Sequence, residues 1–112
     1  MSNITTHILD TSRGKPAGGV LVVLEVRERD EFRELGRGKT DDDGRLKTLL
    51  QGAALERGVH RITFYVSEYF WRYNIETFYP EVSVLFEVKD SSQHYHVPLL
   101  LNPFGYSTYR GS

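Results

Sequence analysis

Histidine and arginine residues that can exchange protons or bind anions lie in three segments that are far apart in the chain. His7 follows two threonines near the start, Arg45 follows an acidic turn, and His94 and His96 flank a tyrosine near the end. A neutral imidazole can take up a proton near neutral pH, and a guanidinium offers a planar set of donors to an oxyanion or a carbonyl. These residue types predict a histidine–arginine site if the fold brings the segments together.

The His-Tyr-His segment has two further interpretations. Residues i and i+2 of a strand lie on the same face, so His94 and His96 would be neighbours, either as ordinary surface side chains or as two ligands of a zinc ion. A zinc site needs a third ligand, and the distant histidines are His7 and His60. Because no carboxylate lies at a metal-binding spacing beside them, we expect a site without metal.

The acidic run at 41–43 does not fit an EF-hand calcium loop, which needs a glycine at its sixth position and a glutamate at its twelfth. Asp43-Gly44 instead predicts a two-residue hairpin turn between strands at 32–39 and 45–49. Arg45 leaves this turn directly. Its backbone would therefore be fixed, so that its guanidinium can be aimed at an oxygen of a substrate.

The composition limits the classes of function. The 112 residues predict one domain, 1–112, and 14 basic against 15 acidic side chains give a net charge of −1, without the basic patch expected of a nucleic-acid or membrane partner. There is no cysteine, and the start of the chain lacks the basic and apolar regions of a signal peptide. We expect a soluble cytoplasmic protein.

Apolar residues recur mainly with a period of two, which is typical of half-buried strands. In the segment 82–88 the alternating valines and Phe86 face one way, while Ser83, Leu85 and Glu87 face the other. Further strands are predicted at 4–9, 20–26, 32–39, 61–66 and 95–100. The segment 67–75 lacks this alternation and predicts one short helix with Ser67 as its cap. Seven or eight strands and one helix indicate an all-β antiparallel β-sandwich.

The end of the chain reads FGYSTYRGS, which is unusual for a frayed terminus because it is rich in aromatic and glycine residues. Phe104, Tyr106 and Tyr109 predict a packed segment. Arg110 and Ser112 are more typical of a binding site. We therefore expect the last residues to form a wall of a site.

Three segments carry a resemblance to a known family when they are read together. They are TTHILDTSRGKPA at 5–17, TDDDGR at 40–45 and HYHVPLLLNPFGYSTYRGS at 94–112. In this order they resemble the transthyretin-like 5-hydroxyisourate hydrolases of urate degradation, and the similarity extends over essentially the whole chain. The closing Tyr-Arg-Gly-Ser is the most specific of these motifs.

The resemblance implies a transthyretin-like fold of two four-stranded antiparallel sheets with one short helix. It implies a homotetramer, a dimer of dimers, with its sites at the interface between dimers. It also implies an activity, the hydrolytic ring opening of the small molecule 5-hydroxyisourate, with no cofactor and no metal.

The family's catalytic residues correspond to His7, Arg45 and His96. Its substrate-binding residues correspond to the closing tetrapeptide, Tyr109, Arg110, Gly111 and Ser112. The resemblance does not tell which histidine is the general base. It also leaves His94 and His60 outside the chemistry.

Two alternatives stay open. Transthyretin, the homologous carrier of aromatic ligands, has the same fold but lacks the histidine–arginine–histidine set and the Tyr-Arg-Gly-Ser ending, so those residues favour the enzyme over the carrier. A zinc-dependent hydrolase that uses His94 and His96 is the second alternative. A fold alone would not decide between them.

Overall fold

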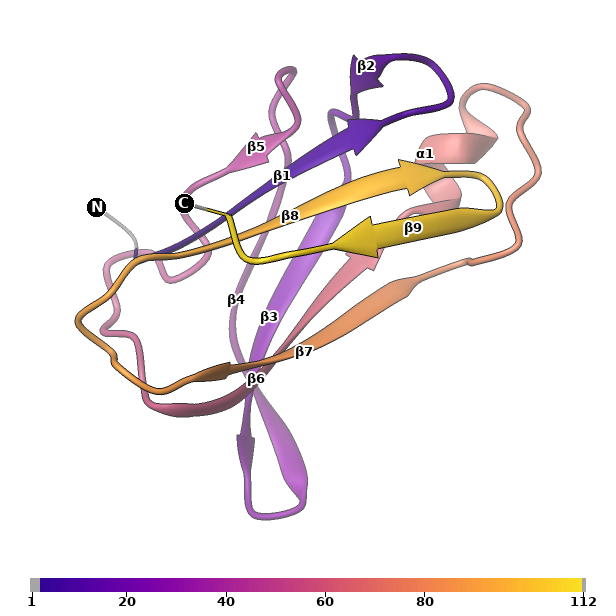
Figure 1. Ribbon diagram of the computed structural model, residues 1–112. Coiled ribbons are helices and arrows are strands. Elements are labelled where there is room, and N and C mark those ends of the chain that lie inside the picture. Colours follow the sequence, from indigo (N-terminus) through magenta and orange to yellow (C-terminus); the bar gives the residue numbers. More distant parts are fainter. Residues whose placement is uncertain (1–2, 112) are drawn as a thin grey trace.

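Two β-sheets pack face to face, and one short helix lies at one end of the sandwich (Figure 1). The structure is a computed structural model that describes residues 3–111. The chain forms its elements in the order β1 (Ile4–Asp10), β2 (Lys15–Pro16), β3 (Leu21–Glu28), β4 (Glu31–Lys39), β5 (Arg45–Leu46), β6 (Gly58–Tyr65), α1 (Ser67–Trp71), β7 (Val82–Val88), β8 (Tyr95–Asn102) and β9 (Gly105–Thr108).

The first sheet has the order β2-β1-β8-β9, with β5 also paired to β1, and the second has the order β4-β3-β6-β7. The predicted two-sheet β-sandwich with one short helix is confirmed. The first sheet differs in detail because the two-residue strands β2 and β5 both pair with β1, which makes five strands. It also differs because β1 and β8 run parallel, whereas an all-antiparallel sheet was predicted.

The core lies between the two sheets and is formed by the inward-facing residues of each strand. Ile62 and Phe64 of β6 are fully buried, as are Ile4 and Ile8 of β1. Full burial of one such side chain contributes roughly 1.5–3 kcal/mol to folding. The predicted alternation in β7 is confirmed, since Val82 and Val88 are buried and Leu85 is exposed. Alternation therefore fixes which side chains of each strand face away from the core.

The helix is shorter than predicted, and its predicted cap is wrong. Val66 is the N-cap residue and makes no side-chain capping bond, while the Ser67 hydroxyl donates to the Pro80 carbonyl at 2.8 Å. Buried Tyr69 and Phe70 anchor the single turn, and the chain reverses soon after it, with Asn74 at a φ of 55°. Among residues 3–111, no helix has the length and apolar character needed to cross a membrane.

The predicted hairpin around Asp43-Gly44 is also wrong, although the turn itself is present. β4 pairs with β3 in the second sheet, whereas β5 pairs with β1 in the first. The chain crosses between the sheets at buried Thr40, whose amide donates to the Val20 carbonyl. The turn therefore connects two sheets, and it delivers Arg45 to β1.

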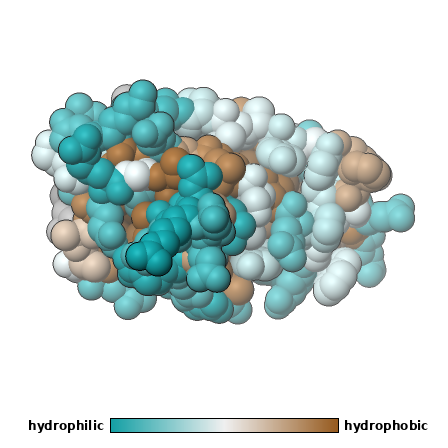
Figure 2. All heavy atoms as spheres, turned by 90° about the horizontal axis from the view of Figure 1, so that it is seen from below, coloured by the Kyte–Doolittle hydropathy of each residue, from teal (hydrophilic) through white to brown (hydrophobic). Residues whose placement is uncertain are grey.

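The end of the chain continues the first sheet. β9, which was not predicted as a strand, pairs with β8, and Tyr106 packs edge-on against Tyr79. Phe104 and Tyr109 are 66% and 58% exposed, so the prediction that they are packed is wrong for the chain by itself. Apolar side chains also reach the surface between hydrophilic ones in the view from below (Figure 2).

Candidate active site

The three predicted segments meet on the outer face of the first sheet. β1 lies between β5 and β8 in this part of the sheet, which places His7 opposite Arg45 and Thr5 opposite His96. Thr5 and His7 are two residues apart on one strand and therefore share a face. The register brings His7, Arg45 and His96 together even though they are far apart in the sequence.

Hydrogen bonds within the acidic turn hold Arg45 in place. One carboxylate oxygen of Asp41 accepts from the amides of Asp43 and Arg45, each at 2.9 Å. These bonds lower the pKa of Asp41, with the Arg45 amide as the largest cause. Gly44 has a φ of 75°, and an added Cβ would lie 2.4 Å from the Ile8 carbonyl oxygen, so both the conformation and the close approach require glycine.

The His7 ring is oriented by the same turn. Its Nε2 lies 2.9 Å from the main-chain carbonyl oxygen of Asp43. A carbonyl oxygen only accepts, so Nε2 of His7 carries the proton and donates it. In a neutral His7 ring, Nδ1 therefore keeps the free lone pair.

The His96 ring is held by a hydroxyl. Thr5 Oγ1 lies 2.8 Å from His96 Nδ1 and 2.8 Å from His94 Nε2, so one buried hydroxyl bridges two imidazoles. Such a hydroxyl has one proton and two lone pairs, so it can donate to one ring while it accepts from the other. His96 is half-buried, and His94 is exposed.

The environment keeps His96 neutral. Burial is the largest cause that lowers its pKa from the ordinary value of 6.5, followed by the charges of His7, His94 and Arg45, while the Thr5 backbone acts in the opposite direction. A histidine with a lowered pKa has its free lone pair available at neutral pH. His96 therefore has the protonation state that a general base requires.

The penultimate residue packs directly against the His96 ring. Gly111 forms an isolated bridge with His96, and its amide donates to the His96 carbonyl at 2.8 Å. A Cβ on Gly111 would lie 2.6 Å from His96 Cδ2, which is closer than real contacts allow. The end of the chain thus forms a wall beside His96 that only glycine fits.

The neighbouring residues of the closing tetrapeptide lie elsewhere. The Arg110 guanidinium is 4.3 Å from the centre of the Tyr95 ring and donates to Gln93 Oε1 and to the His94 carbonyl. Tyr109 is exposed. Their role in binding substrate stays a prediction, and Ser112 lies outside the described residues.

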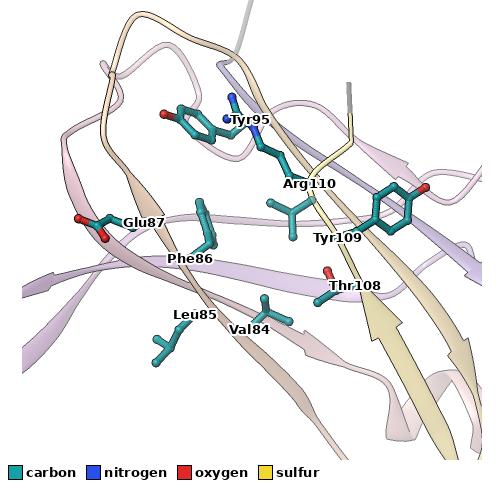
Figure 3. A pocket seen from close by; sticks show the side chains of 9 residues that line it. Val84, Leu85, Phe86, Glu87, Tyr95, Thr108, Tyr109 and Arg110 are labelled. Carbon is teal, nitrogen blue, oxygen red and sulfur yellow. The ribbon is translucent and has the colours of Figure 1, made fainter.

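A cavity of about 330 Å³ opens between β7 and the end of the chain, with Arg110 beside Tyr95 at one end of it (Figure 3). None of His7, Arg45 and His96 lines this cavity. Its walls are formed by Val84, Leu85, Phe86, Glu87, Tyr95, Val97, Thr108, Tyr109 and Arg110. The cavity is therefore lined by part of the closing tetrapeptide and not by the predicted catalytic residues.

The alternative of a zinc site requires three ligands that lie close together. Within residues 3–111, no three side chains from His, Asp or Glu are grouped so that they could hold a metal ion. His94 and His96 share the Thr5 hydroxyl instead. His60 is fully buried in the second sheet, where it donates from Nδ1 to the Gly58 carbonyl.

A family model described as HIUase/Transthyretin matches residues 4–111. The chain belongs to the HIUase/Transthyretin family. It is 48% identical to the 5-hydroxyisourate hydrolase of Halalkalibacterium halodurans over 115 aligned positions, which cover 97% of each chain.

Solved structures with different names share this fold. The 5-hydroxyisourate hydrolase of Klebsiella pneumoniae superimposes with a TM-score of 0.87 and 35% identity, covering 100% of both chains. Sea bream transthyretin in complex with thyroxine gives a TM-score of 0.90 and 28% identity, covering 97% of this chain and 94% of that one. Fold similarity alone therefore does not separate hydrolase from carrier, whereas sequence identity favours the hydrolase.

Two residues beside the predicted histidine–arginine set were missed from the sequence. Thr5 lies two residues before His7 on the same face of β1, which was a usable signal, but its contact with His96 depends on the parallel pairing of β1 and β8. His94 was set aside because it lay outside the recognised motif. The structure places it on the same hydroxyl as His96.

Proposed function

We propose that this protein hydrolyses 5-hydroxyisourate, opening its six-membered ring at a C–N bond. The observation that carries the proposal is the cluster of His7, Arg45 and His96 on one face of the first sheet, with a histidine kept neutral beside an arginine. The high identity to proteins named 5-hydroxyisourate hydrolase supports the same reaction.

The first step is the attack of water on the ring carbonyl. A neutral imidazole of the His7–His96 pair takes a proton from the water while its oxygen forms a bond to the carbonyl carbon. General base catalysis of this kind contributes typically 10²- to 10⁴-fold to the rate. The lowered pKa of His96 supports its presence as the free base at neutral pH.

Arg45 stabilises the oxyanion that forms on the former carbonyl oxygen. A donor that is placed in advance for such an oxygen is worth about 3–4 kcal/mol. The Asp41 turn fixes the Arg45 backbone opposite His7, which sets where its guanidinium starts. When the tetrahedral intermediate collapses, the C–N bond breaks, and the leaving nitrogen takes the proton that the imidazole received from water.

The closing tetrapeptide completes the site in this proposal. Gly111 allows the end of the chain to lie against His96, and Tyr109, Arg110 and Ser112 would hold the substrate. The contact between Gly111 and His96 supports this assignment. Deletion of the last four residues should abolish turnover and leave a folded protein, as measured by circular dichroism and kinetics, and full activity after the deletion would exclude the role.

A homotetramer, arranged as a dimer of dimers, is part of the same proposal. The outer-face cluster is open in the single chain, with His94 and Arg45 exposed, so a second subunit is needed to enclose a substrate there. We also place the protein in the cytoplasm, for which a chain without cysteine is suited. Light scattering on serial dilution tests the assembly, since a stable and active monomer would contradict it.

An assay with far less protein than substrate distinguishes a hydrolase from a ligand carrier. Freshly prepared 5-hydroxyisourate in about hundredfold excess should disappear completely and faster than it decays alone, with one ring-opened product per molecule consumed. A carrier would affect at most one equivalent of the compound and would slow its decay by binding it. Ultraviolet absorbance follows the loss, and mass spectrometry follows the product.

A further inference from the structure

The hydroxyl shared by two histidines determines which nitrogen of His96 carries a proton. We propose that Thr5 and His94 are positioning residues that hold His96 in the Nδ1–H tautomer, so that its Nε2 is the base that takes the proton from water. This inference rests on the proposed function for its chemistry, but its structural part, the tautomer, stands apart from it.

Two arrangements of protons place the Thr5 proton between the two rings. In one, His96 Nδ1–H donates to Thr5 Oγ1, and the Thr5 hydroxyl donates to His94 Nε2. In the other, His94 Nε2–H donates to Thr5, and Thr5 donates to His96 Nδ1, which leaves the His96 proton on Nε2. Both pairs of atoms are 2.8 Å apart, so distance alone does not choose.

The surroundings of the two rings favour the first arrangement. No hydrogen bond of His96 within residues 3–111 uses Nε2, so in the second arrangement the proton on Nε2 would have no protein acceptor. His94 is exposed, so water satisfies its other nitrogen in either tautomer, and it can serve as the final acceptor at no cost. The half-buried His96 has no such freedom.

The remaining nitrogen of His96 is then left for the reaction. Within residues 3–111, His96 makes its side-chain hydrogen bond through Nδ1, and none of its bonds uses Nε2. The ring edge that carries Cδ2, next to Nε2, faces Gly111 and the end of the chain. A lone pair on Nε2 is therefore not used by any hydrogen bond of the described residues.

The His7 ring is held in the opposite tautomer to that proposed for His96. The Asp43 carbonyl requires a proton on Nε2 of His7, so that nitrogen is a donor and is not available as the base. The two histidines are thus held in opposite tautomers by different partners, one by a hydroxyl and one by a carbonyl. The free nitrogen is then Nδ1 in His7 and Nε2 in His96.

Nuclear magnetic resonance of the ¹⁵N-labelled protein at neutral pH reads the tautomer directly, because the shifts of the two ring nitrogens differ between tautomers. Wild type should show His96 as Nδ1–H. His94→Phe removes the nitrogen that accepts the Thr5 hydroxyl proton, and His94 is exposed, so the fold should tolerate the change. The Thr5 hydroxyl should then donate to His96 Nδ1, and the Nε2–H tautomer of His96 should gain population. Thr5→Ser should keep the wild-type tautomer, and Thr5→Val should lose the preference.

Kinetics on 5-hydroxyisourate then connects the tautomer to the reaction. Thr5→Val and His94→Phe should lower kcat roughly 10- to 100-fold, by analogy with the loss when the partner that orients a metal-bound histidine is removed. KM should change little, and Thr5→Ser should recover most of the rate. Thr63→Val is a matched control, because Thr63 is a buried strand threonine bonded to Ser83 in the second sheet.

A wild-type His96 that carries its proton on Nε2 would overturn the inference. So would a His94→Phe variant with an unchanged tautomer and an unchanged kcat. If the tautomers shift as expected but wild type does not hydrolyse 5-hydroxyisourate, the proposed function fails, and the role of Thr5 and His94 in setting the tautomer is upheld.

Discussion

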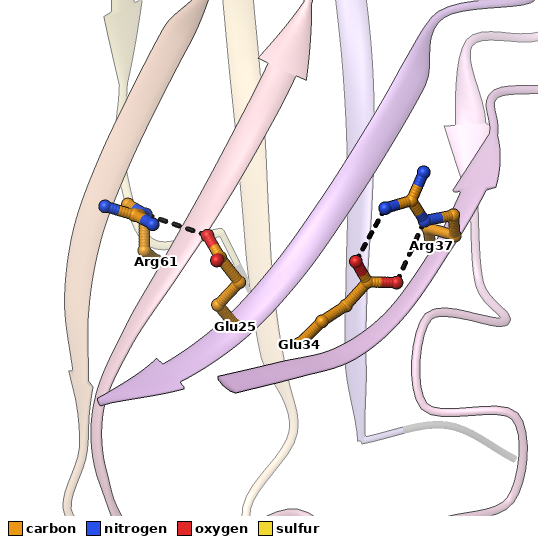
Figure 4. A network of polar contacts seen from close by, with 4 residues as sticks. All are labelled: Glu25, Glu34, Arg37 and Arg61. Atoms are coloured by element: carbon orange, nitrogen blue, oxygen red, sulfur yellow. Dashed lines mark hydrogen bonds and ion pairs between the residues drawn. The ribbon is translucent and has the colours of Figure 1, made fainter. Parts of the chain in front are cut away.

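The outer faces of the two sheets both carry charged strand residues, but two arginines form ion pairs on one face, whereas Arg45 forms none on the other within residues 3–111. On the second sheet, Arg61 pairs with Glu25 at 2.8 Å and Arg37 pairs with Glu34 at 2.6 Å (Figure 4). On the first sheet, Arg45 lies opposite His7 and makes no ion pair within residues 3–111.

This difference distinguishes charged residues that pair with each other from a charged residue that is available to a ligand. A pair of opposite charges on a strand surface satisfies itself, and its net contribution to stability is small because solvent screens it. A guanidinium that is held by its backbone next to two imidazoles has donors to spare for a ligand. The face that carries Arg45 is therefore where chemistry is expected.

Replacement of an arginine on each face gives the largest contrast. Arg45→Gln should lower kcat/KM by about 10²- to 10³-fold, because it removes the donor to the developing oxyanion. Arg37→Gln, which breaks an exposed ion pair on the other sheet, should leave kcat/KM unchanged. Steady-state kinetics on both variants checks this, and equal effects would remove the distinction between the two faces.

A methyl group beside His96 should have the next largest effect. Gly111→Ala places a Cβ 2.6 Å from His96 Cδ2 in the present geometry, so the ring or the chain end must shift. We expect kcat to fall roughly tenfold, since small misplacements of a catalytic group are costly. Gly105→Ala is the control, because its nearest atom would be 3.7 Å away, and a similar loss there would argue against a local cause.

The pH dependence should reflect the lowered pKa of His96. The base must be neutral, so kcat/KM should fall as the pH drops through the folded pKa of His96, which lies below 6.5 because of burial and the nearby charges. In Arg45→Gln one of those charges is absent, so the acid limb should move to higher pH. A wild-type limb above 6.5 would contradict the assignment.

The smallest effect is expected on the outer face of the second sheet. Arg61→Gln breaks the bond to Glu25 and should change the free energy of unfolding by no more than about 1 kcal/mol. Its kcat should equal that of wild type. Denaturant unfolding and kinetics measure both, and a loss of activity would mean that the second sheet takes part in the reaction.

Much of the fold could be predicted from alternation and turn residues. The strand at 82–88 was predicted with its observed bounds, because apolar and polar residues alternate strictly there. The partner of β5 could not be predicted, because Asp43-Gly44 specifies a local turn and does not specify which sheet the chain then joins. The length of α1 was missed because burial of Tyr69 and Phe70, not helix propensity, sets where it ends.

The candidate site could be predicted residue by residue only through the family resemblance. His7, Arg45 and His96 are each unremarkable as single strand residues, and their meeting depends on a parallel register between strands about 90 residues apart. The roles of Thr5 and His94 could not be predicted from motifs. The Thr5 hydroxyl lies between the two imidazoles only because β1 pairs with β8.

The most direct test of the central claim is the decay of freshly made 5-hydroxyisourate, followed by ultraviolet absorbance with wild type and with His96→Asn. The account predicts fast loss of the intermediate with wild type and a kcat lower by roughly 10²- to 10⁴-fold in the variant, which should still fold and assemble as wild type does. Decay with wild type that is no faster than the spontaneous reaction would contradict the account.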